Sequence, residues 1–369
     1  MISAIFCNFV MNMNAIFAKT LEDWYVQNKR DLPWRQTKDP YLIWISEIIL
    51  QQTRVAQGID YYYRFIASFP DISSLASAEE DHVLRLWQGL GYYSRARNLH
   101  KAAKQIVEKG GLFPNTFKEI RSLAGIGDYT AAAIMSFAFD KPYAVLDGNV
   151  YRVLSRIHGI DIPIDSNNGK KLFSKLSQEL LDVNRPALYN QAIMDFGALQ
   201  CLPKGFDCST CPFQMMCVAR FKNIVADLPV KSHKVTIRRR YFHYFYIHDL
   251  EETQMLIRRR SDGDIWQGLY DLPLIESDIN NTLDFDNTWV HSLLNFGAEL
   301  VCHRQGVKHQ LTHQLIICDF YELILPSYKD IKSLIRDIPE LYECMEIPIL
   351  EKENYGMPKL VLQLLDMSD

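Results

Sequence analysis

The sequence predicts a two-domain protein in which an all-α domain is followed by a smaller α+β domain. Its 369 residues suit two domains that can each bury a core. Up to about residue 222, apolar residues recur at three- and four-residue spacing, which is typical of amphipathic helices. From about residue 232, runs of aromatic and β-branched residues between polar turns indicate strands.

The first domain is expected to hold several helices bounded by Pro, Gly, Asp or Asn. The first thirteen residues, MISAIFCNFVMNM, are apolar but lack a basic start and a small-residue cleavage site. We therefore expect an optional N-terminal extension over 1–14, no signal peptide, and a helical domain over 15–222. Segments with helical spacing are 41–57, 94–109, 128–139, 147–158 and 184–199.

A polar, proline-containing segment, NIVADLPVKSHK, places a linker at 223–231 and the second domain at 232–369. Within that domain, YFHYFYIHDLEETQMLIRRR predicts two strands joined by an acidic turn. AELVCHRQG and HQLIICDFYELIL predict further strands, and WVHSLLNF and KDIKSLIRDI predict helices.

Composition excludes some classes of protein. Hydrophobic residues make up 48% and charged residues 23% of the chain, as in ordinary globular proteins. No apolar run reaches the roughly 18–20 residues that span a bilayer. The net charge of −4 divides into +4 up to Lys222 (25 basic, 21 acidic residues) and −8 beyond it (15 basic, 23 acidic). A mildly positive first domain is compatible with a polyanionic partner.

Four of the eight cysteines lie within seventeen residues, CLPKGFDCSTCPFQMMC, spaced C-x6-C-x2-C-x5-C. The others are scattered, which indicates a reducing compartment, and we expect a cytoplasmic protein. There, a tight cluster of thiols more often binds metal than forms disulfides. Chemistry alone leaves Zn²⁺ and an iron–sulfur cluster as alternatives. The candidate ligands are Cys201, Cys208, Cys211 and Cys217.

Glu47 is the only charged residue between Tyr41 and Thr53, in YLIWISEIILQQT. On a helix, its neighbours three and four positions away are mostly apolar. A carboxyl group on such a surface should have a raised pKa and could donate a proton. The alternative is a glutamate that pairs with a distant arginine or reaches solvent at an edge.

Asp147 directly precedes an expected helix, so an N-cap is the structural alternative, and Asn149 competes for that position. As a functional group, a carboxylate held ionised by helix N–H groups could face a cationic sugar. One carboxyl in an apolar setting and one in a hydrogen-bonded setting separate an acid from a nucleophile or an electrostatic stabiliser. Glycoside hydrolysis needs that division of labour.

Gly125 and Gly127 flank Ile126 in a turn before a helix that begins at Asp128. Glycines there allow positive φ, and the N–H groups of such a turn can hold a phosphate oxygen. A plain connection between helices is the alternative. The string LAGIGDYTAAAI resembles the helix-hairpin-helix element of DNA repair glycosylases, which grips the DNA backbone and in some members binds a monovalent cation.

The chain as a whole resembles the MutY family of adenine DNA glycosylases. The resemblance implies a helix-hairpin-helix glycosylase domain with an Fe–S loop, followed by a Nudix-like domain, and the cysteine spacing matches the [4Fe–4S] ligands of endonuclease III and MutY. It also implies a monomeric bacterial enzyme, associated with the nucleoid and not with a membrane, that acts on duplexes with A:8-oxoguanine or A:G mispairs. The matching strings are LPWR, SEIILQQTRV, GLGYYSRARNLH, LAGIGDYTAAAI, LDGNVYRV and QAIMDFGALQC.

The resemblance assigns chemical roles. Glu47 would protonate adenine at N7, and Asp147 would stabilise the oxocarbenium-like sugar or act as a transient nucleophile, with Tyr129 and Asn149 supporting both carboxylates. Tyr129 takes the place of the lysine that forms a Schiff base in endonuclease III-like lyases, so we expect a monofunctional glycosylase. The alternatives are a bifunctional lyase and a catalytically silent DNA-binding or Fe–S sensor protein.

Because an adenine inside a duplex is unreachable, the nucleotide must be extruded, and side chains should fill the gap. By resemblance, Gln52 and Tyr92 are the wedges. Core packing of Tyr92 and a solvated helix start for Arg95 are the alternatives. The residues expected at the DNA are Gly125, Gly127, Gln52, Leu90, Tyr92 and Arg95, and those expected near the adenine are Arg35 and Gln191.

The string GDIWQGLYDLPLIE resembles the C-terminal domain of that family, which is similar to Nudix hydrolases. No Nudix box, with its G-x5-E and R-E-x-x-E-E run, occurs in 232–369, so the domain should bind rather than catalyse. A Phe-Ser-His loop of the family contacts 8-oxoguanine. The matching residues, Leu311, Thr312 and His313, keep a hydroxyl and the imidazole but lose the aromatic ring. A strand start with a turn-side histidine is the alternative.

Overall fold

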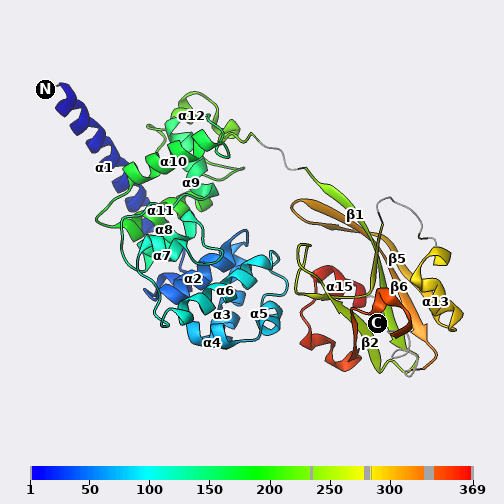
Figure 1. Ribbon diagram of the computed structural model, residues 1–369. Coiled ribbons are helices and arrows are strands. Elements are labelled where there is room, and N and C mark those ends of the chain that lie inside the picture. The colour runs from blue at the N-terminus through cyan, green and yellow to red at the C-terminus, as the bar shows by residue number, and fades with distance from the viewer. Residues whose placement is uncertain (1, 233–235, 278–282, 284, 328–335, 367–369) are drawn as a thin grey trace. The chain divides into compact units, whose positions relative to one another are not determined.

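The computed structural model describes residues 2–232, 236–277, 283, 285–327 and 336–366, with the backbone alone at 2–13 and 287. It divides into two compact units, one of Met1–Ala76 with Lys101–Lys234 and one of Ser77–His100 with Val235–Asp369. Helices build the first unit and a mixed sheet most of the second (Figure 1). The predicted order of an all-α part and an α+β part is therefore confirmed.

The helical part follows the predicted pattern with one exception. The segment 41–57 forms two helices rather than one, because the chain turns at Gln52, whose φ is 57°. Apolar spacing continues across this turn and conceals it. The helices are α1 (Ile2–Asn28), η1 (Pro33–Arg35), α2 (Pro40–Leu50), α3 (Val55–Ser68), α4 (Ile72–Ser77), α5 (Glu80–Leu86), α6 (Ser94–Glu108), α7 (Phe117–Arg121), α8 (Asp128–Phe137), α9 (Gly148–His158), α10 (Asn167–Leu180), α11 (Pro186–Leu199), α12 (Val218–Phe221) and η2 (Val225–Asp227).

Helix α11 lies at the centre of the first unit and packs against α1, α8 and α9. Trp24 of α1 meets Phe196 of α11 edge to face, with the ring centroids 5.1 Å apart. Gly197 lets α9 approach closely, because a Cβ there would lie 2.7 Å from Cβ of Asn149. These contacts fix the starts of α8 and α9 relative to α11.

The second unit is built on one sheet with the central order β3-β2-β1-β6-β5. Strands β1 and β6 run parallel, and the other pairings are antiparallel. The four strands and the first helix predicted for this part are present. The strands are β1 (Arg238–Asp249), β2 (Gln254–Arg259), β3 (Tyr270–Asp271), β4 (Leu274–Ser277), β5 (Glu299–Gln310), β6 (Gln314–Leu325) and β7 (Cys344–Pro348). The helices are η3 (Phe285–Asn287), α13 (Trp289–Asn295), η4 (Pro339–Leu341), η5 (Ile349–Asn354) and α15 (Lys359–Leu365).

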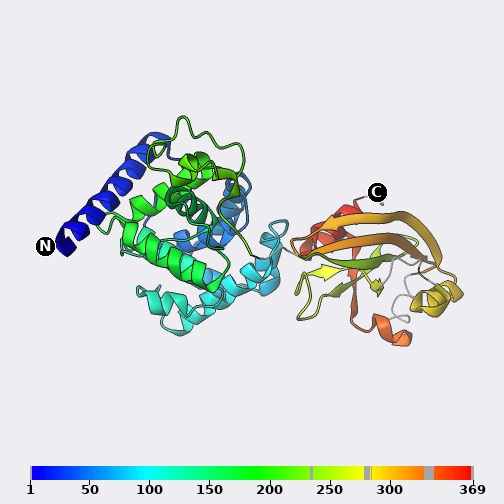
Figure 2. The ribbon, with the colours of Figure 1, turned by 90° about the horizontal axis from the view of Figure 1, so that it is seen from above.

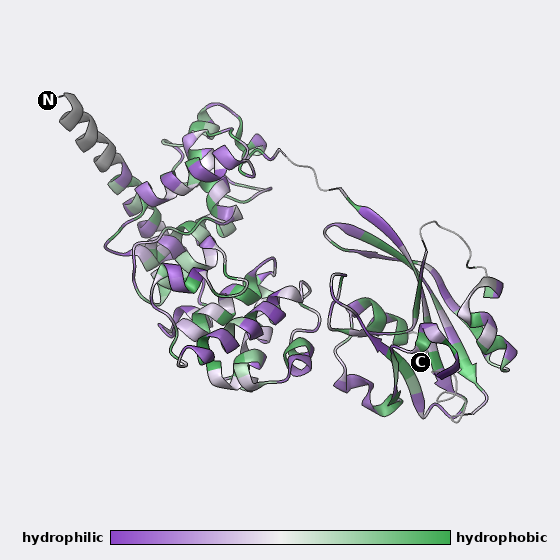
Figure 3. Cartoon of the chain, in the orientation of Figure 1, coloured by the Kyte–Doolittle hydropathy of each residue, from purple (hydrophilic) through white to green (hydrophobic). Residues whose placement is uncertain are grey.

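Helices α15 and α13 cover different faces of this sheet (Figure 2). Phe242 and Tyr244 of β1 join the core under α15, whereas Phe245 and Ile247 join the core under α13. Because both faces of β1 are covered, its residues from Arg240 on are buried or half-buried, and Figure 3 shows green, hydrophobic stretches on the strands of this sheet. The predicted helix KDIKSLIRDI falls mostly outside the described residues.

None of the helices in the described residues combines the length and apolarity that crossing a membrane requires.

Candidate functional site

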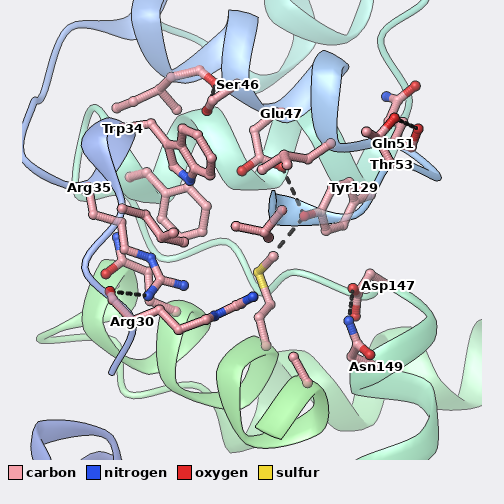
Figure 4. Close-up of a pocket in the computed structure, with 18 of the residues that line it drawn as sticks. Arg30, Trp34, Arg35, Ser46, Glu47, Gln51, Thr53, Tyr129, Asp147 and Asn149 are labelled. Atoms are coloured by element: carbon pink, nitrogen blue, oxygen red, sulfur yellow. Dashed lines mark hydrogen bonds between the residues drawn. The ribbon is translucent and has the colours of Figure 1, made fainter. Parts of the chain in front are cut away.

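A cavity of about 550 Å³ in the first unit collects residues that lie far apart in the sequence. Its walls come from η1, α2 and the turn after it, the starts of α8 and α9, and α11 (Figure 4). The carboxyl groups of Glu47 and Asp147 both line this cavity. The predicted site residues in its lining are Arg35, Glu47, Gln52, Tyr129, Asp147, Asn149 and Gln191.

Glu47 lies on α2 and is 6% exposed. The hydroxyl of Tyr129 donates to its Oε2 atom at 2.9 Å (Figure 4). Burial raises the pKa of Glu47 to about 7, and the Asp147 charge acts in the same direction, while the Tyr129 hydrogen bond and Arg35 oppose the rise. Near neutral pH, much of Glu47 is therefore protonated, as a proton donor must be.

Asp147 is the N-cap of α9, as its position suggested, and it also lines the cavity. The N–H of Val150 donates to its Oδ1 atom at 2.8 Å, and the amide of Asn149 donates to its Oδ2 atom at 2.9 Å (Figure 4). Burial nevertheless raises the pKa of Asp147, against these hydrogen bonds. A carboxylate this poorly solvated gains most when a positive charge develops beside it.

Two arginines on α9, Arg152 and Arg156, link this site to the cysteine loop, and they were not predicted from the sequence. Arg152 donates to Oδ1 of Asn149 and to the carbonyl of Gly197, each at 2.7 Å, and to the carbonyl of Cys201 at 2.8 Å. Arg156 donates to Sγ of Cys201 at 3.4 Å. The spacing of residues 149, 152 and 156 places all three on one face of the helix, and this pattern could have identified the two arginines from the sequence.

The four clustered cysteines line one small cavity with Arg156 and Phe206. Burial, and to a smaller degree the neighbouring thiols, raise the pKa values of Cys208, Cys211 and Cys217. No described cysteine is in a disulfide. Among the described residues, no three His, Cys, Asp or Glu side chains are arranged to hold a single metal ion.

The loop before α6 exposes Tyr92 and buries Leu90 and Arg95. Tyr92 is 42% exposed with φ of 48°, which suits a side chain at a loop tip. Arg95 is instead 9% exposed and donates to the carbonyls of Leu90 and Gly91 at 3.3 and 3.0 Å. Burial lowers the pKa of Arg95 to about 10. Arg95 therefore supports the loop from inside rather than offering an exposed cation, and Leu90, 8% exposed, packs in the loop base.

In the turn between α7 and α8, Gly125 has the positive φ that a glycine allows, whereas Gly127 is extended, with φ of −92°. Gly125 has φ of 73°, and Gly127 is the N-cap of α8. Arg121 holds the turn by donating to the carbonyl of Ile126 at 3.0 Å and to Asp128 at 2.6 Å. Both glycines remain exposed, so the turn can be reached from solvent.

In the second unit, Leu311, Thr312 and His313 form the turn between β5 and β6 and line a cavity of about 410 Å³. Trp266 and Tyr92 line the same cavity, and the Thr312 and Tyr92 hydroxyls are hydrogen-bonded. Leu311 packs against the sheet core, while Thr312 and His313 are exposed. The Thr312 hydroxyl, which is bonded to Tyr92, and the exposed imidazole of His313 are thus the polar groups at this turn.

Comparisons with known proteins agree with this architecture. Residues 45–181 match the HhH-GPD superfamily of base excision DNA repair proteins, and residues 243–367 match the NUDIX domain. A thermostable thymine-DNA glycosylase of known structure is 29% identical with a TM-score of 0.53, covering 57% of this chain and 97% of its own.

Curated relatives extend over most of the chain. The adenine DNA glycosylase of Buchnera aphidicola subsp. Baizongia pistaciae is 37% identical over 302 residues, which is 81% of this chain and 83% of that protein. The adenine DNA glycosylase of Mus musculus is 45% identical over 213 residues, 55% of this chain and 41% of that protein. The protein is therefore a DNA glycosylase of base excision repair, and it belongs to the adenine DNA glycosylase family.

Proposed function

We propose that this enzyme hydrolyses the N-glycosidic bond of adenine mispaired with 8-oxoguanine or guanine in double-stranded DNA. The observation that carries the proposal is that two carboxyl groups line one cavity. Glu47 has a pKa of about 7, and Asp147 caps the start of helix α9. Excision of a base requires its extrusion from the stack, and the exposed Tyr92 and the cavity-lining Gln52 are the groups proposed to fill the gap.

In the proposed reaction, Glu47 gives its proton to N7 of the extruded adenine. The C1′–N9 bond then breaks with its electron pair going to the base, which leaves as a neutral purine. Asp147 stabilises the positive sugar or bonds to it transiently, with Asn149 and Tyr129 holding the two carboxylates. Water adds to C1′, and the deprotonated Glu47 takes a proton from that water, which regenerates the acid.

The test is base release from duplexes that carry adenine opposite 8-oxoguanine, guanine or thymine, followed by alkali to cleave abasic sites. We expect release opposite 8-oxoguanine and guanine, with strand cleavage only after alkali, because the Tyr129 phenol cannot form an imine. Release of adenine from none of the three duplexes would overturn the proposal. Efficient trapping with borohydride would overturn its monofunctional part.

Recognition of the base opposite adenine is proposed for the second unit. Thr312 and His313 present a hydroxyl and an imidazole at the β5–β6 turn, beside Trp266 in one cavity. An oxidised guanine offers polar groups that suit such partners. Leu311 lies against the core and adds apolar surface rather than a stacking ring. The proposed substrate partner is the duplex, bound by a single copy of the chain.

We also propose that Cys201, Cys208, Cys211 and Cys217 hold a [4Fe–4S] cluster. Four thiols around one small cavity match the donor set of such a cluster. When bound, the cluster would fix the loop 201–217 and leave the chemistry to the carboxyl groups. Arg152 and Arg156 tie that loop to α9. A monovalent cation at the α7–α8 turn remains a further proposal.

Cys211→Ser should therefore lower the iron content from about four atoms per chain and destabilise the first unit, because one ligand of the cluster is lost. Iron analysis and thermal unfolding of protein purified without oxygen measure both. Cys302→Ser, at an exposed cysteine of β5, is the matched control and should change neither. Stoichiometric zinc in the wild type would contradict the assignment.

The excision rate of the wild type should fall about tenfold per pH unit above pH 7. The reason is that Glu47 acts in its protonated form and its pKa is raised to about 7, so the acid is present below that pH and lost above it. At acid pH the rate should fall again as Asp147 is protonated. Single-turnover rates between pH 5 and 9 test this. A rate that rises from pH 7 to 9 would indicate a base instead.

A further inference from the structure

The turn between β2 and β3 carries an aromatic side chain with an unusual backbone conformation. Trp266 has φ of 59°, in the left-handed region that bulky residues rarely adopt. Such strain persists only where the surrounding structure enforces it, and it is concentrated at binding and catalytic sites. Trp266 is half-buried and lines the cavity of about 410 Å³ that also holds Thr312 and His313. The strain therefore points to a role of this side chain at the cavity.

A buried charge network enforces the conformation of the turn. Asp264 accepts hydrogen bonds from Arg240, at 2.5 and 2.9 Å, and from Arg260. Arg260 also donates to the carbonyl of Ile265 at 2.9 Å. Arg240 and Arg260 are only 6% and 7% exposed. Because Arg240 lies on β1, in the middle of the sheet, the residues before Trp266 are tied to the sheet rather than left as a free loop.

The carboxylate at the centre of this network stays ionised near neutral pH. Burial favours its protonation, but the hydrogen bonds from Arg240 and from the N–H of Ile265, together with the Arg260 charge, lower the pKa of Asp264 well below its usual value. On the other side of the turn, the N–H of Leu269 donates to the carbonyl of Trp266 at 2.9 Å. The backbone of the tryptophan is thus fixed on both sides, which holds its indole at the cavity wall.

The indole gives the cavity an aromatic wall beside the polar turn 311–313. His309, on the strand that leads into this turn, meets the indole with the ring centroids 5.9 Å apart. The Arg260 guanidinium lies 5.8 Å from the indole centroid. Polar groups bind a base at its edge and distinguish one base from another, whereas an aromatic ring stacks on the π-face that every base has. The cavity therefore combines a wall suited to discrimination with a wall suited to affinity.

We propose that Trp266 binds the base opposite the extruded adenine by stacking, and so contributes affinity for that base without discriminating between 8-oxoguanine and guanine. This inference rests on the proposed function and deepens it. The two bases share one purine ring system, so the same indole can stack on either. They differ at N7 and C8, where 8-oxoguanine carries an N–H and an oxygen. Discrimination between them is left to the polar groups of the turn 311–313.

The test is the affinity of Trp266→Leu for duplexes that carry a tetrahydrofuran abasic-site analogue in place of the adenine, so that there is no base to release. The opposite position holds 8-oxoguanine, guanine or a second analogue without a base. We expect the Kd to rise about tenfold for both bases, as the loss of stacking on one base would produce. The Kd should stay unchanged where the opposite base is missing. Fluorescence anisotropy of labelled duplexes measures all three values.

Two further variants separate stacking from folding. Trp266→Phe keeps an aromatic ring and should retain most of the affinity. Trp266→Asn removes the ring but suits a positive φ, so it should lose the affinity while the unit stays folded. Tyr342→Leu is the matched control, because Tyr342 is an exposed aromatic residue of the same unit and lies outside this cavity. It should change none of the three Kd values. Thermal unfolding of each variant shows that it is folded.

Three results would overturn the inference. One is an unchanged Kd for both bases in folded Trp266→Leu. Another is an equal loss on the duplex without an opposite base, since Trp266 would then act through the fold or the DNA backbone. The third is a loss confined to 8-oxoguanine, since the ring would then discriminate. If the wild type releases adenine and only these Kd values fail, the proposed function stands. If it releases adenine from no duplex, the proposed function itself fails.

Discussion

Glu47→Gln should reduce adenine release roughly 10³-fold, within the range that general acid catalysis contributes. The amide has nearly the shape of the acid and can still accept the Tyr129 hydrogen bond through its oxygen, but it has no proton of suitable acidity for a purine. Its residual rate should lose the dependence on pH around 7 that the wild type shows. Single-turnover excision at pH 6 and 8 measures both effects.

The same substitution should stabilise the protein at alkaline pH. Burial raises the pKa of Glu47 from 4.5 to about 7, so the folded state holds this proton more tightly than the unfolded state, and wild-type stability falls as pH rises between these values. The cost at pH 8 is on the order of 3 kcal/mol, and Glu47→Gln avoids it. Urea unfolding at pH 5 and 8 measures the difference.

Glu22→Gln is the matched control for the loss of excision rate and for the loss of its pH dependence. Glu22 is 3% exposed, and burial raises its pKa too, but it pairs with Arg185 and does not line the cavity. We expect this variant to release adenine at the wild-type rate. An inactive Glu22→Gln, or an active and folded Glu47→Gln, would remove Glu47 from the role of acid.

Asp147→Asn should reduce excision by roughly 10³-fold while the protein stays folded, because it deletes the charge proposed to stabilise the sugar. Asparagine is as good an N-cap as aspartate, and its oxygen can still accept the N–H of Val150. Thermal unfolding should therefore change little, and binding to a mispaired duplex should persist. Excision rate, melting temperature and duplex affinity of one preparation give all three results.

Asp39→Asn makes the same change at another helix start. Asp39 caps α2 by accepting the N–H of Tyr41 at 2.8 Å and is exposed outside the cavity. We expect its excision rate to match the wild type. If Asp147→Asn unfolds the protein while Asp39→Asn does not, Asp147 acts mainly as a structural cap, and the stabilising role proposed for it is wrong.

Local patterns predicted the elements and the two carboxyl groups because each had a short-range signature. A lone charge in an apolar helix identified Glu47, and a helix start identified Asp147. Long-range partners left no such signature. Arg35 meets Asp195 across 160 residues, and Tyr25 meets Gln191 across 166. Neither pair can be found without the packing of α1 against α11.

Burial can also change the use of a charged group, which local patterns do not reveal. Arg95 was expected at the DNA, and in the structure the loop folds around it and its Nη2 atom donates to two loop carbonyls. The turn at Gln52 was hidden for a related reason, since apolar spacing continues through it. In both places the three-dimensional path of the chain, rather than residue type, decides the role.

The contact between Gly197 and Asn149 has a genetic consequence. Every missense change in the codon for residue 197 adds at least one carbon where a Cβ would stand 2.7 Å from a neighbouring Cβ and 3.2 Å from backbone atoms of Asn149. Alanine, among the mildest of exchanges elsewhere, would push the start of α9 away and move the Asp147 carboxylate with it. We therefore expect selection to keep glycine at residue 197, because its side chain is a single hydrogen atom and any larger one would clash with Asn149.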